Sequence, residues 1–112
     1  MKYWDLESIK DLTGKNIIVT GSNTGLGFAT AKEIASKGAN VILACRSQKR
    51  AQNAKDKILE KYPNAKLDII LLDLGDLSKI EKFVKEYKEK YNTLDILINN
   101  AGVMTTPYMK TE

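Results

Sequence analysis

The chain has 112 residues, a net charge of +4, 43% hydrophobic and 29% charged residues, a composition that predicts one globular domain over residues 1–112. One cysteine and no histidine exclude a disulfide framework and the usual zinc sites, and no apolar run reaches the ~20 residues of a membrane span. The 16 lysines alternate with glutamates along helical patterns, which favours solvated helix faces over a nucleic-acid surface. We therefore expect no metal, no nucleic acid partner, no transmembrane segment and a cytoplasmic protein.

The stretch from Asn16 to Gly27 predicts a strand, a glycine-rich turn and the start of a helix. Its apolar run, residues 17–19, is typical of a strand buried on both faces. Three glycines follow with the spacing Thr-Gly-x-x-x-Gly-x-Gly, which differs from the Gly-x-Gly-x-x-Gly of the standard dinucleotide fingerprint. Such a turn lets the backbone approach a pyrophosphate, and the helix N-terminus supplies free N–H groups. The alternative is a tight strand-to-helix turn that holds no ligand.

Strand and helix patterns alternate along the rest of the chain. Apolar spacing predicts helices over about 26–37, from 47 or 48 to 62, and from 78 to about 91. A continuous apolar run predicts a strand over 40–45. A run that begins in alternation and then becomes apolar predicts one over 66–72, and a further strand is predicted over 94–98. Gly38 is the expected C-terminal glycine of the first helix, and Ser78-x-x-Glu81 is interpreted as a capping box for the third. Before the first strand, four apolar residues are expected to pack on the sheet edge: Trp4, Leu6, Ile9 and Leu12.

This β-α-β-α-β-α-β order predicts an α/β fold with a Rossmann-type, doubly wound parallel sheet. The strand order is expected to be 3-2-1-4, with the alternating third strand at an edge. A ligand then lies at the carboxyl ends of strands one and four, where the order reverses. The glycine turn and the segment Asn99-Asn100-Ala101-Gly102 both belong to that edge.

The end of the second predicted strand indicates which nicotinamide cofactor would bind. In NAD sites an acid about 20 residues past the glycines bonds the ribose hydroxyls, whereas here Cys45 and Arg46 stand at that place. A guanidinium grips a 2′-phosphate at two points, so Arg46 favours NADP over NAD. The alternative is that Arg46 caps a loop or covers the sheet end. Lys49 and Arg50 are weaker candidates, and Cys45 is expected to be a buried thiol.

Polar residues after the third and fourth strands are further candidates. Asp73 can accept from an adenine amino group beside Leu74, or it can order its own turn. Asn99 and Asn100 can tie the loops together or touch the cofactor ribose. Gly102 would let the chain pass close to a cofactor.

Three of these motifs together resemble the short-chain dehydrogenase/reductase family: residues 20–27, Asp73-Leu74 and residues 99–102. The segments 11–15, 44–46 and 103–112 are similar to its retinol-dehydrogenase-like, NADP-dependent branch. The resemblance implies hydride transfer between NADP(H) and the carbonyl or alcohol carbon of a small molecule, such as a retinol-like hydrophobic alcohol. The cofactor-binding residues it implies are Gly21, Ser22, Asn23, Thr24, Gly25, Leu26, Gly27, Arg46, Asp73, Leu74, Asn100, Ala101 and Gly102.

The catalytic residues of that family have no counterpart in this chain. The family uses a serine and a Tyr-x-x-x-Lys pair on elements after the fourth strand, but Tyr108 is followed four residues later by Glu112. Tyr62 and Lys66 have the spacing, but Pro63 lies between them and we interpret the pair as coincidence. We therefore expect an N-terminal, cofactor-binding fragment of an oxidoreductase, truncated after strand four and inactive alone. The alternatives are a non-catalytic nucleotide-binding or regulatory module and an inactive remnant.

Overall fold

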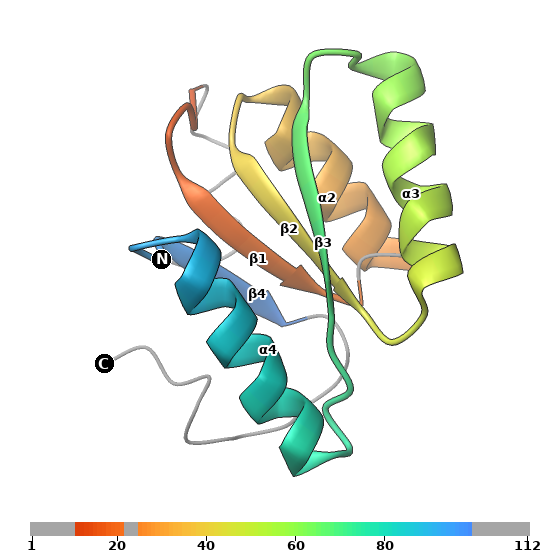
Figure 1. The fold of residues 1–112 in the computed structure, drawn as a ribbon. Helices are drawn as coiled ribbons and strands as arrows, with labels where there is room; N and C mark the ends of the chain where they lie inside the picture. The colour runs from red at the N-terminus through yellow and green to blue at the C-terminus, as the bar shows by residue number, and fades with distance from the viewer. Residues whose placement is uncertain (1–10, 22–24, 100–112) are drawn as a thin grey trace.

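A computed structural model describes residues 11–21 and 25–99 and contains seven regular elements in strict alternation (Figure 1). The four strands form one parallel sheet in the order β3-β2-β1-β4. This confirms the predicted strand order and the Rossmann-type fold. The elements are β1 (Asn16–Thr20), α2 (Gly25–Ser36), β2 (Asn40–Cys45), α3 (Gln48–Lys61), β3 (Lys66–Leu71), α4 (Leu77–Lys90) and β4 (Ile96–Asn99).

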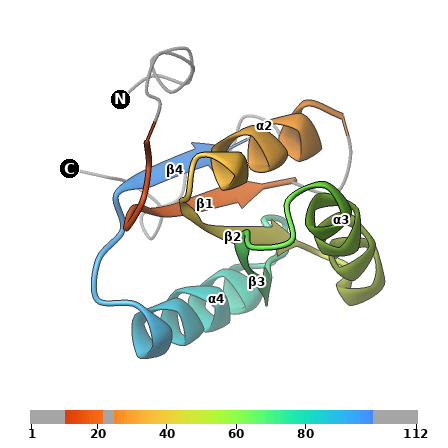
Figure 2. The ribbon, with the colours of Figure 1, turned by 90° about the horizontal axis from the view of Figure 1, so that it is seen from above.

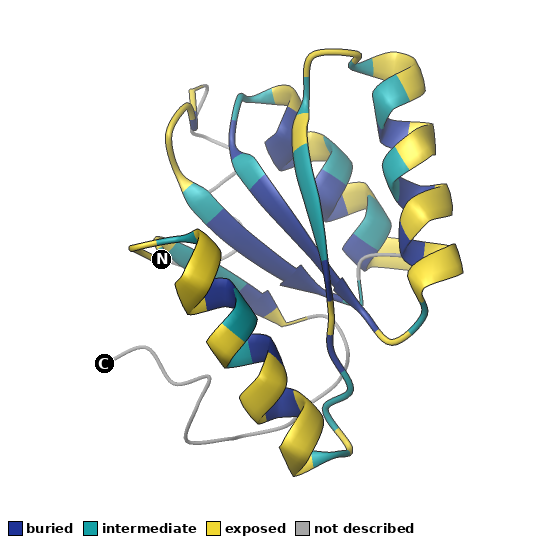
Figure 3. Cartoon of the chain, viewed as in Figure 1, coloured by how far each residue is buried: buried dark blue, intermediate teal, exposed yellow. Residues whose placement is uncertain are grey.

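The sheet lies between two helical layers, with α2 and α3 on one side and α4 on the other (Figure 2). Successive strand residues point to opposite faces, so Ile17 and Val19 pack with α2 and α3, whereas Ile18 packs with α4. The central strands are therefore buried on both faces, while the helices expose their outer faces (Figure 3). In the part of the chain that the structure describes, α4 is the one helix that covers its face of the sheet.

Three local predictions differ from the structure. The capping box at Ser78 is wrong, because Asp76 is the N-cap of α4 and its carboxylate accepts from the Ser78 N–H at 3.0 Å. Asp76 has the extended backbone that an N-cap needs, so the helix begins one residue before Ser78. Strand β4 also begins two residues later than predicted, at Ile96. Leu12 is buried in the core beside α2 rather than at a sheet edge, and residues 1–10 lie outside the described part.

Helix α2 ends in a Schellman motif that requires glycine. The Gly38 N–H donates to the Ala35 carbonyl at 3.1 Å, and the Ala39 N–H donates to the Ile34 carbonyl at 3.4 Å. Gly38 has a φ of +92°, in the left-handed region, which confirms its predicted role. A Cβ on Gly38 would lie 2.6 Å from Thr13 Oγ1.

Gly38→Ala is expected to lower the free energy of unfolding, measured with urea, by about 2–4 kcal/mol. The loss has two causes, because alanine is strained in left-handed backbone and its Cβ would clash with Thr13. Moving the Thr13 hydroxyl away would break the hydrogen bond that it donates to the Asp11 carboxylate at 2.6 Å. Gly14→Ala is the matched control, since Gly14 has a φ of +83° but open space around its Cβ position. It should cost about 1 kcal/mol. Equal losses in the two variants would contradict the clash.

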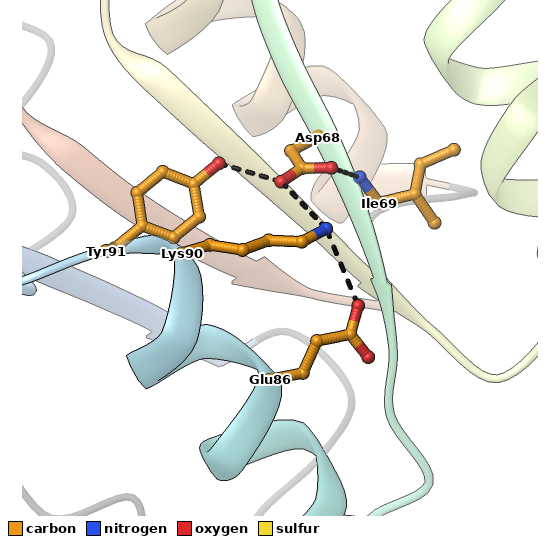
Figure 4. Close-up of polar contacts among 5 residues, drawn as sticks. All are labelled: Asp68, Ile69, Glu86, Lys90 and Tyr91. Carbon is orange, nitrogen blue, oxygen red and sulfur yellow. Dashed lines mark hydrogen bonds and ion pairs between the residues drawn. The ribbon is translucent and has the colours of Figure 1, made fainter.

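The C-terminal end of α4 is tied to the edge strand β3 through Asp68 (Figure 4). The Asp68 carboxylate accepts from the Tyr91 hydroxyl at 2.8 Å and lies 3.6 Å from the Lys90 ammonium. Lys90 also pairs with Glu86 at 3.5 Å. The pKa of the Tyr91 phenol is raised, first by burial and second by the hydrogen bond to Asp68. This network fixes the position of α4 relative to the outer strand of the sheet.

Tyr91→Phe should lower the free energy of unfolding by about 1 kcal/mol at neutral pH, because it removes one hydrogen bond to a charged acceptor. A phenol whose pKa is raised on folding contributes stability that is present below its unfolded pKa of about 10 and is lost at higher pH. Wild-type stability should therefore fall more steeply above about pH 10 than that of the variant. Urea unfolding followed as a function of pH measures both effects, and parallel pH curves would contradict them.

Candidate functional site

The register of the parallel sheet brings four chain segments to one edge. Thr20 is level with Ala44 on one side and with Asn99 on the other, and Cys45 is level with Leu71. The residues that follow the strands, Gly21, Arg46 and Asp73 among them, therefore leave the sheet at its carboxyl edge. This is the edge at which the sequence predicts a ligand site, and it includes the point between β1 and β4 where the strand order reverses.

The described ends of the glycine turn have backbone that only glycine adopts readily. Gly21 has a φ of +62° and Gly25 a φ of +58°. The Gly21 N–H donates to the Ala44 carbonyl at 3.0 Å, so the chain leaves β1 still attached to β2. Gly27 is buried in α2, and Leu26 beside it is 62% exposed. The predicted site residues Ser22, Asn23 and Thr24 lie outside the described residues.

Helix α2 begins at this turn, and its first turn contains no acidic residue. The N-terminus of a helix carries a partial positive charge and unpaired N–H groups. No carboxylate of that first turn competes with an incoming anion, so the geometry suits a phosphate.

Strands β1 and β4 are joined at the same edge by a polar contact. Thr20 is buried, and its hydroxyl donates to the Asn99 side-chain oxygen at 2.8 Å. Asn99 thus ties two strand ends together, which is the scaffold role among its two predicted alternatives. The predicted candidates Asn100, Ala101 and Gly102 come directly after it and lie outside the described residues.

Arg46 is exposed at the end of β2 and lines a hollow of about 290 Å³. Helix α3 begins two residues later, where Ser47 caps it by accepting from the Arg50 N–H at 3.3 Å. The first turn of α3 holds Lys49 and Arg50 and no acidic residue. Cations at a helix N-terminus oppose the helix dipole, so positive potential accumulates here and would be relieved by a bound anion.

Asp73 lines the same hollow from the end of β3. Its carboxylate accepts from the Gly75 N–H at 2.9 Å, which shows the turn-ordering role predicted as one alternative. Leu74 is half-buried and packs against the cluster beneath α4. Sequence reasoning missed Lys79 and Lys82, which line the hollow from α4. The sequence feature that could have identified them is their spacing of three residues on the helix that follows Asp73, which places both on one face.

Other candidate chemistry is not assembled in the part of the chain that the structure describes. No group of three potential metal ligands occurs among residues 11–21 and 25–99, and no helix there is long and apolar enough to cross a membrane. Cys45 is buried, as predicted. Tyr62 is the C-cap of α3 and Lys66 begins β3, so this pair lies at the amino edge of the sheet, away from the glycine turn.

Comparison with known proteins gives a consistent result. The family model described as short chain dehydrogenase matches residues 15–112. The WW domain-containing oxidoreductase of Gallus gallus is 44% identical over 103 residues, which cover 92% of this chain and 25% of that protein. Retinol dehydrogenase 12 of Homo sapiens is 43% identical over 100 residues, covering 89% of this chain and 32% of that protein. The chain thus spans about a quarter to a third of these relatives.

A solved structure has the same fold. It is a metagenomic short-chain oxidoreductase in complex with NADP, with a TM-score of 0.74 and 29% identity. The match covers 82% of this chain and 41% of that one.

Proposed function

The chain belongs to the short chain dehydrogenase family, and on that premise we propose that it is the cofactor-binding part of an NADP-dependent oxidoreductase. The proposed reaction of the whole oxidoreductase is hydride transfer between NADP(H) and the carbonyl or alcohol carbon of a small molecule. The similarity to a retinol dehydrogenase supports a hydrophobic alcohol of that kind as substrate. The observation that carries the proposal is the position of Arg46, exposed beside the hollow at the carboxyl edge, where an NAD-binding site has an acid.

The described residues fit the cofactor. The pyrophosphate would lie against the turn between Gly21 and Gly25 at the N-terminus of α2, where no first-turn carboxylate repels it. The 2′-phosphate would be held by Arg46, and adenine would lie near Asp73 and Leu74. The similar oxidoreductase solved with NADP supports this choice of cofactor. When bound, the nicotinamide would supply or accept the hydride, and the residues named here would hold the adenosine and pyrophosphate part of the cofactor.

Two calorimetric titrations test the proposal, one with NADPH and one with NADH. We expect the 112-residue chain to bind NADPH more tightly than NADH and to show no carbonyl reduction, because it has no catalytic serine and tyrosine in the family arrangement. A chain that binds neither nucleotide would overturn the proposal. Carbonyl reduction by this chain alone would contradict the purely cofactor-binding role. Binding of NADPH would not by itself separate this role from that of a non-catalytic nucleotide-binding module. A longer chain that reduces a carbonyl would do so.

A further inference from the structure

The hollow beside Arg46 has two chemically different walls. One wall is apolar and is formed by the outer part of β3, where Leu71 is 45% exposed. The other wall is cationic and comes from α4, which lies alongside β3 (Figure 1) and contributes Lys79 and Lys82. Arg46 and Gln48, at the end of β2 and the start of α3, also line it. A hollow lined by both apolar residues and cations suits a ligand with a flat ring and a phosphate.

The charges in this hollow leave the cations available. Its two acids are Asp73 and Glu86, and each already has a donor: the Gly75 N–H for Asp73 and the Lys90 ammonium for Glu86. No ion pair within 4.0 Å joins Arg46, Lys79 or Lys82 to a carboxylate elsewhere in residues 11–21 and 25–99. The nearby acid Asp76 is the N-cap of α4, and the hydrogen bond from Ser78 and, as a smaller cause, the charge of Lys79 lower the pKa of its carboxyl.

The size of the hollow indicates which part of a ligand it would take. About 290 Å³ is at the lower end of the ~300–1,000 Å³ of small-molecule pockets, so it suits one end of a dinucleotide rather than the whole molecule. The end that carries both a flat ring and a phosphomonoester is the adenosine 2′-phosphate. This group carries about −1.5 to −2 charges at neutral pH.

We propose that Lys79 and Lys82 are specificity-determining residues that bind the 2′-phosphate of NADP together with Arg46. This inference rests on the proposed function and extends it to α4. The guanidinium supplies directed hydrogen bonds, and the two ammonium groups supply charge from α4. The network around Asp68 holds the far end of α4 against β3 and so keeps the cationic wall in place.

The test uses two nucleotides that lack the nicotinamide, 2′,5′-ADP and 5′-AMP, titrated into the 112-residue chain. The double variant Lys79→Ala/Lys82→Ala should bind 2′,5′-ADP about three- to tenfold more weakly and 5′-AMP with little change. The matched control is Lys85→Ala/Lys88→Ala, which removes the same charge from the outer face of α4, away from this hollow. It should change neither affinity by more than about twofold. Lys79→Arg/Lys82→Arg should retain binding of 2′,5′-ADP.

The outcomes separate this inference from the proposed function. If the wild type prefers 2′,5′-ADP and the Lys79/Lys82 double variant keeps that preference, the inference is overturned and the NADP proposal stands. Equal losses of affinity in the two double variants would also overturn the inference, because only net charge would then matter. If the wild type binds neither of these nucleotides nor NADPH, the proposed function is overturned, and the inference that rests on it is overturned as well. Circular dichroism and urea unfolding of each variant establish that it is folded before titration.

Discussion

Replacement of Arg46 by alanine is expected to weaken NADPH binding by about 10- to 100-fold while changing NADH affinity only slightly. Hydrogen bonds to charged groups are worth about 1.5–3 kcal/mol, and each 1.4 kcal/mol is a factor of ten. The Arg46 side chain is exposed at the mouth of the hollow, so its removal should leave the fold intact. Calorimetric titration with both nucleotides measures the effect.

The control for Arg46 is Arg50→Ala, which removes an equal charge from the third residue of the neighbouring helix α3. The Ser47 cap of α3 uses the backbone N–H of Arg50, so this substitution keeps the cap. A loss of NADPH affinity of threefold or less is expected, from long-range charge alone. If Arg50→Ala reproduces the full loss of NADPH affinity, or if Arg46→Ala weakens the binding of NADPH and NADH equally, Arg46 does not bind the 2′-phosphate.

The sequence predicted the sheet well because its strands are strongly patterned. Residues 17–19 and 41–45 are continuous apolar runs, and the structure buries both on two faces. A parallel sheet then leaves few strand orders possible. The errors fall at element ends, where local polar contacts decide. Asp76 and Ser78 are both good N-cap residues, and only the geometry shows that Ser78 donates to Asp76. Likewise, the Asp95 N–H donates to the Asn16 carbonyl before β4 begins.

Only the site residues that come directly after strands could be predicted from the sequence. Arg46 and Asp73 come directly after strands, so topology alone places them at one edge. Lys79 and Lys82 could not be singled out in the same way, because they are two among many helical lysines. Their position beside Arg46 depends on how α4 packs on β3. The structure also shows Asn99 and Asp73 making the scaffold contacts that sequence reasoning had left as alternatives.

Phe83→Ala is expected to lower the free energy of unfolding by about 3–5 kcal/mol, the usual cost of removing a buried aromatic ring. Phe83 is 2% exposed and packs with Ile18, Ile42 and Ile70 under α4. In the described part of the chain α4 is the one helix on that face, so no second described helix lies there to fill the space. Small domains have total stabilities of only about 5–15 kcal/mol, so a large part of the stability should be lost. Urea unfolding at fixed pH measures the change.

The control for Phe83 is Lys85→Ala on the exposed face of α4, which should change stability by less than about 0.5 kcal/mol. A comparably small loss in Phe83→Ala would mean that α4 is not fixed to the sheet as described. NADPH offers an independent check, because a ligand that binds only the folded state stabilises it by an amount set by its concentration and affinity. If the variant keeps its hollow, saturating NADPH should raise its stability by the same increment as in the wild type. A smaller increment would show that the packing under α4 also shapes the site at the sheet edge, since Phe83 itself does not line the hollow.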